Sequence, residues 1–188
     1  MNRATRLSFL VRARTASDTA LVFGSDGVLI KGQEERVRRS VEGLGHCHGL
    51  FSAPEMAAQA TAAMLDFVSA TCAAAGDIDY GRWRGRSFES VLKTDPDELT
   101  QWLHDPAAVP HGGESLAMAA HRVATWMAQE KDAGGHRLVI THGMIVKLAM
   151  ASVLDAPLTA VSRIDLPFMA VVSFRSDGKR WNLVINER

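Results

Sequence analysis

Two segments that lie far apart in the sequence carry side chains suited to holding an oxyanion. His142 stands between an apolar run at 137–141 and a predicted helix at 143–154, and Arg12 follows an apolar run at 7–11. Backbone N–H groups at the start of a helix favour a bound anion, and an arginine can bind two anion oxygens at once. If the two segments converge, Arg12 and His142 form the outline of a phosphate site. Taken singly, each has a plainer explanation, His142 as a hydrogen-bonded core histidine and Arg12 as a surface charge.

The pattern of apolar residues predicts the elements that position these two residues. Strands are expected at 7–11, 50–52, 137–141, 169–175 and about 181–185, and helices at 32–43, 54–75, 115–133 and 143–154. Such an alternation is typical of an α/β domain with a mostly parallel sheet flanked by helices, here with an antiparallel hairpin at its end. In such sheets ligands bind beyond the carboxyl ends of the strands, where Arg12 and His142 both lie.

The helix predicted at 54–75 is rich in alanine and methionine, and its apolar residues have helical spacing. This spacing is more typical of a helix packed in the core than of a cofactor pocket. The residues expected in the core are Met56, Ala60, Met64, Phe67 and Val68.

The middle of the chain differs in character from both flanks. Residues 76–113 are loop-rich, carry Trp83, Trp102 and three prolines, and contain short helical stretches near 88–93 and 97–104. We expect a cap or rim insertion around residues 76–114 within a single domain spanning 1–188, because this length and a hydrophobic content of 47% suit one compact core.

Composition narrows the range of partners and compartments. The chain has 21 basic and 21 acidic side chains, so no overall field would recruit nucleic acid or a membrane surface. The two cysteines, Cys47 and Cys72, are too few for a disulfide framework, and no apolar stretch reaches membrane-spanning length. We expect a cytoplasmic protein with free thiols, no metal or cofactor, and no nucleic-acid or membrane partner. The composition does not indicate the oligomeric state.

Four blocks of sequence, in this order, resemble the histidine phosphatase (phosphoglycerate mutase-like) superfamily. They are Leu-Val-Arg at 10–12, Tyr-Gly-Arg-Trp-Arg-Gly at 80–85, Pro-His-Gly-Gly-Glu-Ser at 110–115 and Val-Ile-Thr-His-Gly at 139–143. The resemblance covers nearly the whole chain and implies a three-layer, phosphoglycerate mutase-like α/β domain. In that superfamily the first strand ends in Arg-His-Gly, and the histidine attacks phosphorus to form a phosphohistidine.

The resemblance also implies roles for individual residues of this chain. Arg12 and His142 correspond to ligands of the phosphoryl oxygens, and Thr15 lies where the family often has a threonine near the pocket. Ser115 corresponds to a serine that binds a phosphate oxygen or simply caps the following helix. Asp77 corresponds to the general acid, usually a glutamate, and a shorter carboxylate can still deliver a proton if its pKa is raised. Asp77 is equally consistent with a solvated loop residue.

Three positions depart from the family pattern. Ala13 stands at the nucleophile position, and its methyl group has no lone pair, so covalent catalysis by the usual route is unavailable. Ala57 stands where a second arginine would clamp the phosphate, which removes another set of donors. Arg14 replaces the family glycine and brings bulk and charge to that turn.

Other histidines were weighed as substitutes or ligands. His111 adjoins a glycine-rich turn and is the best candidate for replacing the nucleophile, although turn residues of this type usually face water. His46 and His48 flank Cys47 and share one face of an extended segment, but no third and fourth metal ligand is apparent, so no metal site is expected. The remaining histidines are expected on helix surfaces or in loops: His104, His121 and His136.

A second, weaker resemblance involves residues 21–29. They are similar to the Asp-x-Asp-Gly-Val-Leu loop of haloacid-dehalogenase-type phosphatases, but Gly24 stands at the position of the attacking aspartate. We therefore interpret Asp26 and Gly27 as a turn.

Three functions are consistent with these residues. The first is a non-catalytic protein that retains part of a phosphate pocket and binds a phosphorylated small molecule or a protein partner. The second is a weak or redirected phosphatase or phosphomutase-type enzyme, in which Arg12 and His142 stabilise the phosphoryl group, Asp77 protonates the leaving oxygen and water attacks directly. The third is a structural interaction protein with a vestigial pocket, which no sequence feature specifically favours.

Overall fold

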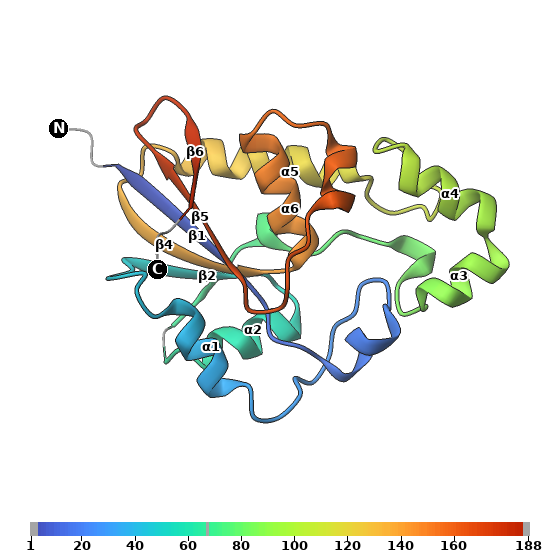
Figure 1. The fold of residues 1–188 in the computed structure, drawn as a ribbon, viewed down its shortest axis with the longest axis horizontal. Helices are drawn as coiled ribbons and strands as arrows, with labels where there is room; N and C mark the ends of the chain where they lie inside the picture. Colours follow the sequence, from blue (N-terminus) through green and yellow to red (C-terminus); the bar gives the residue numbers. More distant parts are fainter. Residues whose placement is uncertain (1–3, 67, 186–188) are drawn as a thin grey trace.

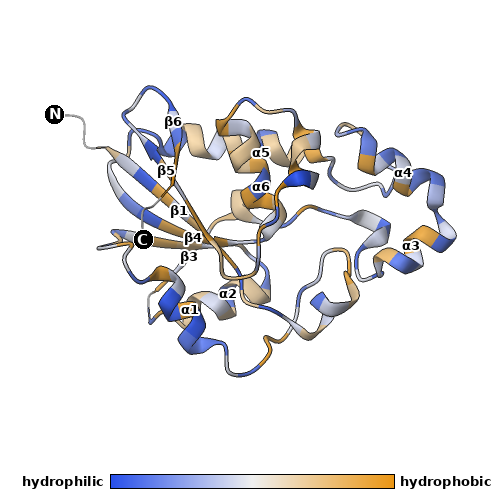
Figure 2. Ribbon diagram, in the orientation of Figure 1, coloured by the Kyte–Doolittle hydropathy of each residue, from blue (hydrophilic) through white to orange (hydrophobic). Residues whose placement is uncertain are grey.

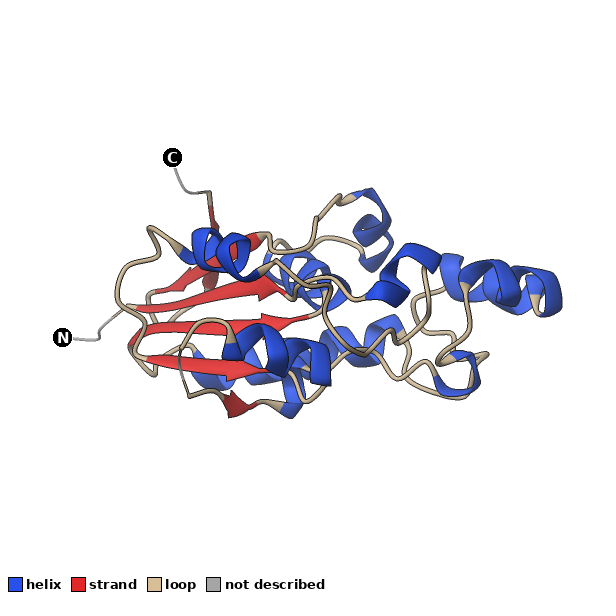
Figure 3. Ribbon diagram, turned by 90° about the horizontal axis from the view of Figure 1, so that it is seen from below, coloured by secondary structure: helices blue, strands red, loops and turns tan. Residues whose placement is uncertain are grey.

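The computed structural model describes residues 4–66 and 68–185, which form a mixed sheet covered by helices on both faces (Figures 1 and 3). In the sheet, the strand order is β3 (Ala70–Thr71), β2 (Gly49–Ser52), β4 (Gly135–Thr141), β1 (Thr5–Val11), β5 (Val171–Ser176), β6 (Trp181–Val184). The first four strands are parallel, whereas β5 runs antiparallel to β1 and β6 antiparallel to β5. The predicted α/β fold, with a parallel sheet and a terminal antiparallel hairpin, is confirmed.

β1 lies in the interior of the sheet and brings the two predicted site segments together. Its sequence is almost entirely buried, as expected for a strand covered on both faces. In its register with β4, Val11 pairs with Thr141, and the Arg12 N–H donates to the Thr141 carbonyl at 2.8 Å. Arg12 and His142 therefore leave neighbouring strands side by side at the carboxyl edge, and their predicted convergence is confirmed.

Helices complete the outer two layers. The helices α5 (Leu116–Glu130) and α6 (Gly143–Val153) cover one face of the sheet, and α1 (Glu34–Val41) and α2 (Met56–Ala63) cover the other (Figure 1). Figure 2 shows the contrast between the hydrophilic α1, which buries Val37, and the more hydrophobic α6. Under α5, Phe9 of β1 contacts Trp126 and Phe174 edge to face, at ring-centroid distances of 6.2 and 5.5 Å.

The helix predicted at 54–75 is wrong in its second half. α2 ends at Ala63, Asp66 adopts a left-handed φ of 57° that stops the helix, and the chain then forms the short edge strand β3. The packing face was predicted only in part, because Met64 packs against the core but Met56 is 58% exposed and Val68 98% exposed. Phe67 lies outside the described residues. The helix instead buries small side chains that allow close packing against the sheet: Ala57, Ala58, Thr61 and Ala62.

Residues 76–114 contain α3 (Phe88–Thr94) and α4 (Pro96–His104), which extend beyond the end of the sheet (Figure 1). Both short helices were predicted. An aromatic cluster holds them to the rest of the chain: Phe23, Tyr80, Trp83, Phe88, Trp102 and His111. Two loops meet here backbone to backbone, because a Cβ on Gly113 would lie 2.0 Å from the carbonyl oxygen of Asp79.

Short 3-10 segments connect the longer elements. They are Ala16–Ala20, Ala73–Ala75, Gly81–Trp83 and Leu158–Arg163. None of the helices in the described ranges has the length and apolar content needed to cross a membrane.

Candidate functional site

Arg12 is 4% exposed at the end of β1, and hydrogen bonds occupy all five of its N–H donors. Its Nε donates to His142 Nδ1 at 3.3 Å. Its Nη1 donates to the Ala13 carbonyl and to Asp18 Oδ2, both at 2.9 Å. Its Nη2 donates to Asp18 Oδ1 at 2.8 Å and to the Ser25 carbonyl at 3.2 Å. The guanidinium is thus fully coordinated by the protein itself.

Asp18 forms a bidentate ion pair with Arg12, and its side chain is 6% exposed. Burial alone would raise the pKa of Asp18, but the hydrogen bonds from Arg12 and from the Thr15 backbone lower it from 3.8 to about 2. Thr15 contributes its N–H at 2.6 Å and its hydroxyl at 2.9 Å. Asp18 is therefore ionised at neutral pH and balances the charge of Arg12.

His142 precedes α6 and lies among two carboxylates and the guanidinium. Its Nε2 lies 3.2 Å from Glu55 Oε2, and its Nδ1 lies 3.4 Å from Asp77 Oδ2. Arg12 donates an N–H to Nδ1, so in the neutral form of the ring the proton is assigned to Nε2, which then donates to Glu55.

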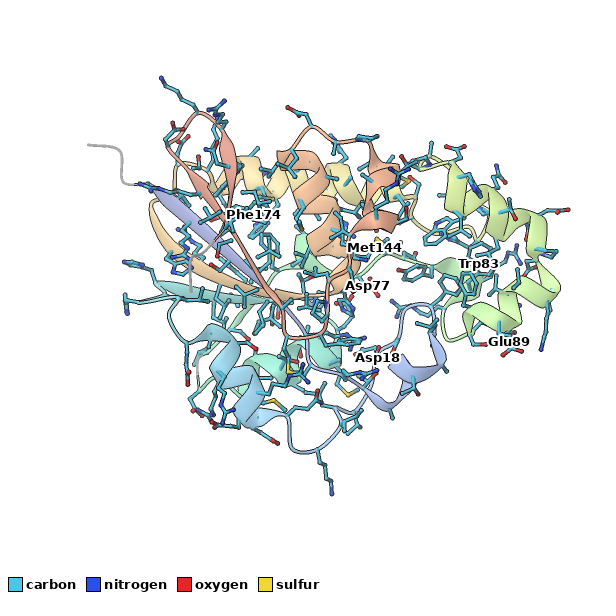
Figure 4. The ribbon with its side chains drawn as sticks, in the orientation of Figure 1. Asp18, Asp77, Trp83, Glu89, Met144 and Phe174 are labelled. Carbon is cyan, nitrogen blue, oxygen red and sulfur yellow. The ribbon has the colours of Figure 1, made fainter. Side chains whose placement is uncertain are left out.

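The two carboxyl groups beside His142 differ in their readiness to hold a proton. Burial raises the pKa of Asp77, and the charges of His142 and Arg12 offset this only in part. Burial also acts to raise the pKa of Glu55, but its hydrogen bond and charge interaction with His142 leave the pKa lowered overall. Asp77 is therefore the better proton carrier of the pair. Figure 4 shows Asp77 and Asp18 beyond the ends of β1 and β4.

Ala13, which the resemblance to the superfamily places at the nucleophile position, has a fully buried methyl group. Ala13 is 0% exposed, and its N–H donates to Thr61 Oγ1 at 3.0 Å. The Thr61 hydroxyl in turn donates to the Ala57 carbonyl at 2.7 Å. Ala57 is also fully buried, and the side chain of neither alanine can act as a hydrogen-bond donor or a nucleophile at this site.

The start of α2 is occupied by a carboxylate. Asp26, expected only as part of a turn, accepts N–H groups from Met56 at 3.0 Å and from Ala57 at 2.8 Å. These are the unpaired N–H groups of a helix N-terminus, where negative charge is favoured. Asp26 thus holds the position at which an external anion could bind α2.

Arg14 lies on the rim of this site. The Phe168 ring centroid lies 5.2 Å from the Arg14 guanidinium carbon and 5.5 Å from that of Arg12. The Arg14 side chain is exposed, and its backbone N–H donates to Gln33 Oε1 at 3.0 Å. Arg14, which the resemblance places at a family glycine, therefore adds a positive charge and a cation–π contact beside Arg12.

Ser115 and His111, two further candidates from the sequence, make their hydrogen bonds to nearby backbone N–H groups. Ser115 caps α5, since its hydroxyl accepts the Met118 N–H at 3.0 Å. His111 does not face water as a turn residue would: it is 2% exposed, packs against the rings of the aromatic cluster, and accepts the Gly113 N–H through Nδ1. Burial lowers the pKa of His111.

The expectation that His136 lies in a loop or on a helix surface is wrong. It lies in β4, where Nε2 is 2.8 Å from Ser8 Oγ and Nδ1 is 3.6 Å from Cys47 Sγ. Burial lowers the pKa of His136 to about 4. The rings of His46 and His48 lie 4.9 Å apart near the amino end of β2, and residues 4–66 and 68–185 contain no group of three or more side chains placed to hold a metal.

Three site residues were missed by the sequence analysis: Asp18, Asp26 and Glu55. A signal existed for Asp18, because Thr15-x-x-Asp18 fits the spacing of a capping box, and the structure contains that box. Glu55 lies three residues beyond the strand end at Ser52, so the rule that placed Arg12 and His142 also applies to it. Asp26 gave no comparable signal, because its partner is a helix start elsewhere in the fold.

The sheet order and the Arg12–His142 pair at its carboxyl edge define an α/β domain of the phosphoglycerate mutase-like class. The sequence model of the histidine phosphatase superfamily (branch 1) matches residues 32–187, and the chain belongs to this superfamily. The match begins after the segment with Arg12 and Ala13.

Curated relatives include the bifunctional protein Rv2228c of Mycobacterium tuberculosis and the uncharacterized protein Mb2253c of Mycobacterium bovis. Each is 27% identical over 117 residues, which is 59% of this chain. The matched segment spans 32% of the length of these relatives.

Solved structures share the fold at low identity. The mycobacterial glucosyl-3-phosphoglycerate phosphatase Rv2419c, in complex with VO3, superposes with a TM-score of 0.80 at 20% identity, covering 96% of this chain and 97% of that one. A putative alpha-ribazole-5'-P phosphatase from Escherichia coli superposes with a TM-score of 0.83 at 18% sequence identity, covering 99% of this chain and 97% of that one. A histidine-to-alanine mutant of phosphoserine phosphatase from Entamoeba histolytica, in complex with phosphoserine, superposes with a TM-score of 0.81 at 18% sequence identity. The superposition covers 96% of this chain and 95% of that one.

Proposed function

We propose that this chain is a non-catalytic member of the superfamily that binds a phosphorylated small molecule, or a protein partner, at the Arg12–His142 pair. The observation that carries the proposal is the fully buried methyl group of Ala13 directly after Arg12. A methyl group can neither attack phosphorus nor carry a phosphoryl group, so the covalent step of the family has no acceptor at this position. Fold alone does not supply an activity when the reacting group is missing.

The groups that could hold an anion, in contrast, lie together, although Asp18 and other protein groups bond to Arg12 in this structure. Arg12 supplies a planar fork of N–H donors, and His142 stands at the N-terminus of α6, whose first backbone N–H groups favour negative charge. The Entamoeba phosphoserine phosphatase supports binding without an intact histidine set, since a histidine-to-alanine mutant of that protein was obtained in complex with phosphoserine.

The test is oxyanion binding measured by thermal shift with phosphate, vanadate and tungstate. A ligand that binds only the folded state at 100 times its Kd adds about 2.7 kcal/mol, which for a chain of this length raises Tm by about 5–10 °C. We expect a shift for the wild type that is lost in His142→Ala. His121→Ala, at an exposed position on α5, is the matched control and should retain the shift.

Two results would overturn the proposal. Absence of any shift at saturating oxyanion, for a folded wild type, would exclude ligand binding at this pair. Release of phosphate from phosphorylated substrates that disappears in His142→Ala would show that the protein is catalytic after all.

A second candidate function is a weak phosphatase that uses water in place of the histidine. The raised pKa of Asp77, whose Oδ2 lies 3.4 Å from His142 Nδ1, favours this candidate, because a protonated carboxyl group can donate its proton to the leaving oxygen. Turnover that is abolished by Asp77→Asn would identify it. The double change Ala13→His with Ala57→Arg should restore at least trace phosphatase activity, and failure in a folded variant would show that Arg14 and the rim have reshaped the pocket.

A further inference from the structure

The segment from residue 16 to residue 30 contacts Arg12 of the candidate site and the start of α2. It begins with the 3-10 segment Ala16–Ala20 and returns to Arg14, whose carbonyl accepts the Ile30 N–H at 2.9 Å. In between, the Phe23 N–H donates to the Arg86 carbonyl at 2.9 Å, which attaches the segment to the cap region. The segment therefore lies between the cap and the strand end that carries Arg12.

This segment places one carboxylate on the arginine fork. The two oxygens of Asp18 accept from Nη1 and Nη2 of Arg12, which is the arrangement that two oxygens of a phosphoryl group would adopt. The other three N–H donors of Arg12 are held by protein groups, including the carbonyl of Ser25 in the same segment. No donor on Arg12 is left for an external anion while Asp18 stays in place.

The same segment places a second carboxylate on the neighbouring anion-binding element. Asp26, which follows Ser25 directly, accepts the first N–H groups of α2, an eight-residue helix. Asp18 and Asp26 thus occupy two of the groups of donors that the fold offers to a phosphate, and the start of α6 is the third. On the other side of the pocket, Glu55 and Asp77 face His142.

The negative charges of these carboxylates oppose the binding of a phosphate. A phosphate monoester carries up to two negative charges, and adding them beside these carboxylates is unfavourable unless some of the carboxylates leave. We propose that the segment 16–30 is an internal occupant of the phosphate site, and that a phosphorylated ligand binds by displacing Asp18 and Asp26 from Arg12 and the start of α2. This proposal rests on the proposed function and describes how that same site is regulated.

The packing of the segment allows such a displacement. Three of its large apolar side chains are exposed, Leu21 at 72%, Val28 at 81% and Ile30 at 42%, and the 3-10 segment that carries Asp18 buries no apolar side chain. Two side chains are packed inside: Phe23 is 8% exposed and packs in the aromatic cluster, and Leu29 is partly buried against the core. Segments that bury little apolar surface open at low free-energy cost, and Phe23 would act as the fixed point about which the flanking parts move.

The experiment compares tungstate affinity, by isothermal titration, of the wild type with Asp18→Asn, Asp26→Asn and the double variant. Removal of one negative charge next to the bound anion should raise the affinity about tenfold, and the double variant should bind most tightly. Asp132→Asn, at an exposed position beyond the far end of the sheet, is the matched control and should leave affinity unchanged. Arg12→Lys, placed in the Asp18→Asn background, should remove the gain because lysine lacks the planar fork.

Amide hydrogen exchange supplies a readout that does not depend on affinity. Saturating tungstate should speed exchange within 16–30 and slow it at the start of α6. If the wild type binds tungstate with dependence on His142, but Asp18→Asn binds no better and exchange in 16–30 is unchanged, displacement is refuted and the proposed function stands. If the wild type is silent and the double variant binds, the carboxylates occupy the site but the anion does not displace them, so displacement is overturned together with the proposed function. If neither binds, both the displacement and the proposed function are overturned.

Discussion

Replacement of Asp18 by asparagine should destabilise the folded protein in a manner that depends on pH. Asp18 and Arg12 form a pair whose side chains are 6% and 5% exposed, so solvent screens the interaction little. The fall in the pKa of Asp18 from 3.8 to about 2 corresponds to about 2 kcal/mol of stability at pH 7. Asparagine keeps one acceptor but turns an N–H group towards Arg12, and we expect a loss of about 2–3 kcal/mol.

The sign of the pH dependence follows from the direction of the pKa change. Because the pKa is lower in the folded than in the unfolded state, the contribution of Asp18 is fully present above pH 3.8 and is lost as the pH falls through about 2. At pH 3 about half of it should remain. The difference in the free energy of unfolding between wild type and Asp18→Asn should therefore narrow as the pH is lowered. The reason is that the wild type loses the contribution of the ionised Asp18 carboxylate, which the variant lacks at every pH.

Urea denaturation followed by tryptophan fluorescence, at pH 7 and at pH 3, measures both effects, and the chain carries four tryptophans as reporters. Asp132→Asn should show no such pH-dependent gap. The reasoning fails if Asp18→Asn is as stable as the wild type at pH 7. It also fails if the gap between the two proteins is the same at both pH values.

Three further outcomes are expected. Ser115→Ala should lower stability by about 1 kcal/mol through loss of the helix cap, without changing oxyanion affinity, and a loss of affinity in a folded variant would instead place the hydroxyl at the ligand. Gly113→Ala should cost about 3 kcal/mol or more by urea denaturation, because its Cβ would lie 2.0 Å from a carbonyl oxygen, whereas Gly27→Ala, with no atom within 4 Å, should stay within about 0.5 kcal/mol. Burial raises the pKa of the thiols of Cys47 and Cys72, so both should react with iodoacetamide more slowly in the native protein than in urea; equal rates would contradict this.

The placement of Arg12 and His142 could be predicted because it depends on a property of the strand pattern. Parallel strands end at one edge of a sheet, so two residues that follow two buried strands must lie close together when the strands are neighbours. The cap at Ser115 could be predicted for a similar reason, since a helix start is a local signal in the sequence.

What the sequence did not reveal depends on contacts between distant segments. His111 and His136 stand beside glycines, a pattern typical of exposed loops, yet tertiary packing buries both. Residues 54–75 have helical composition throughout, but Asp66 in a left-handed conformation ends the helix early. Asp26 acquires its partners only when the loop that carries it reaches the start of α2, which no local pattern encodes.

The position of β1 in the sheet has a consequence for the order in which the protein folds. β1 is formed by residues 5–11, but its two neighbours are β4 at 135–141 and β5 at 171–176. During synthesis, β1 therefore has no partner strand until more than a hundred further residues have been made. Pairing of strands across such sequence separations is slow. Arg12 cannot meet His142 before that closure, so the candidate site is among the last parts of the molecule to form.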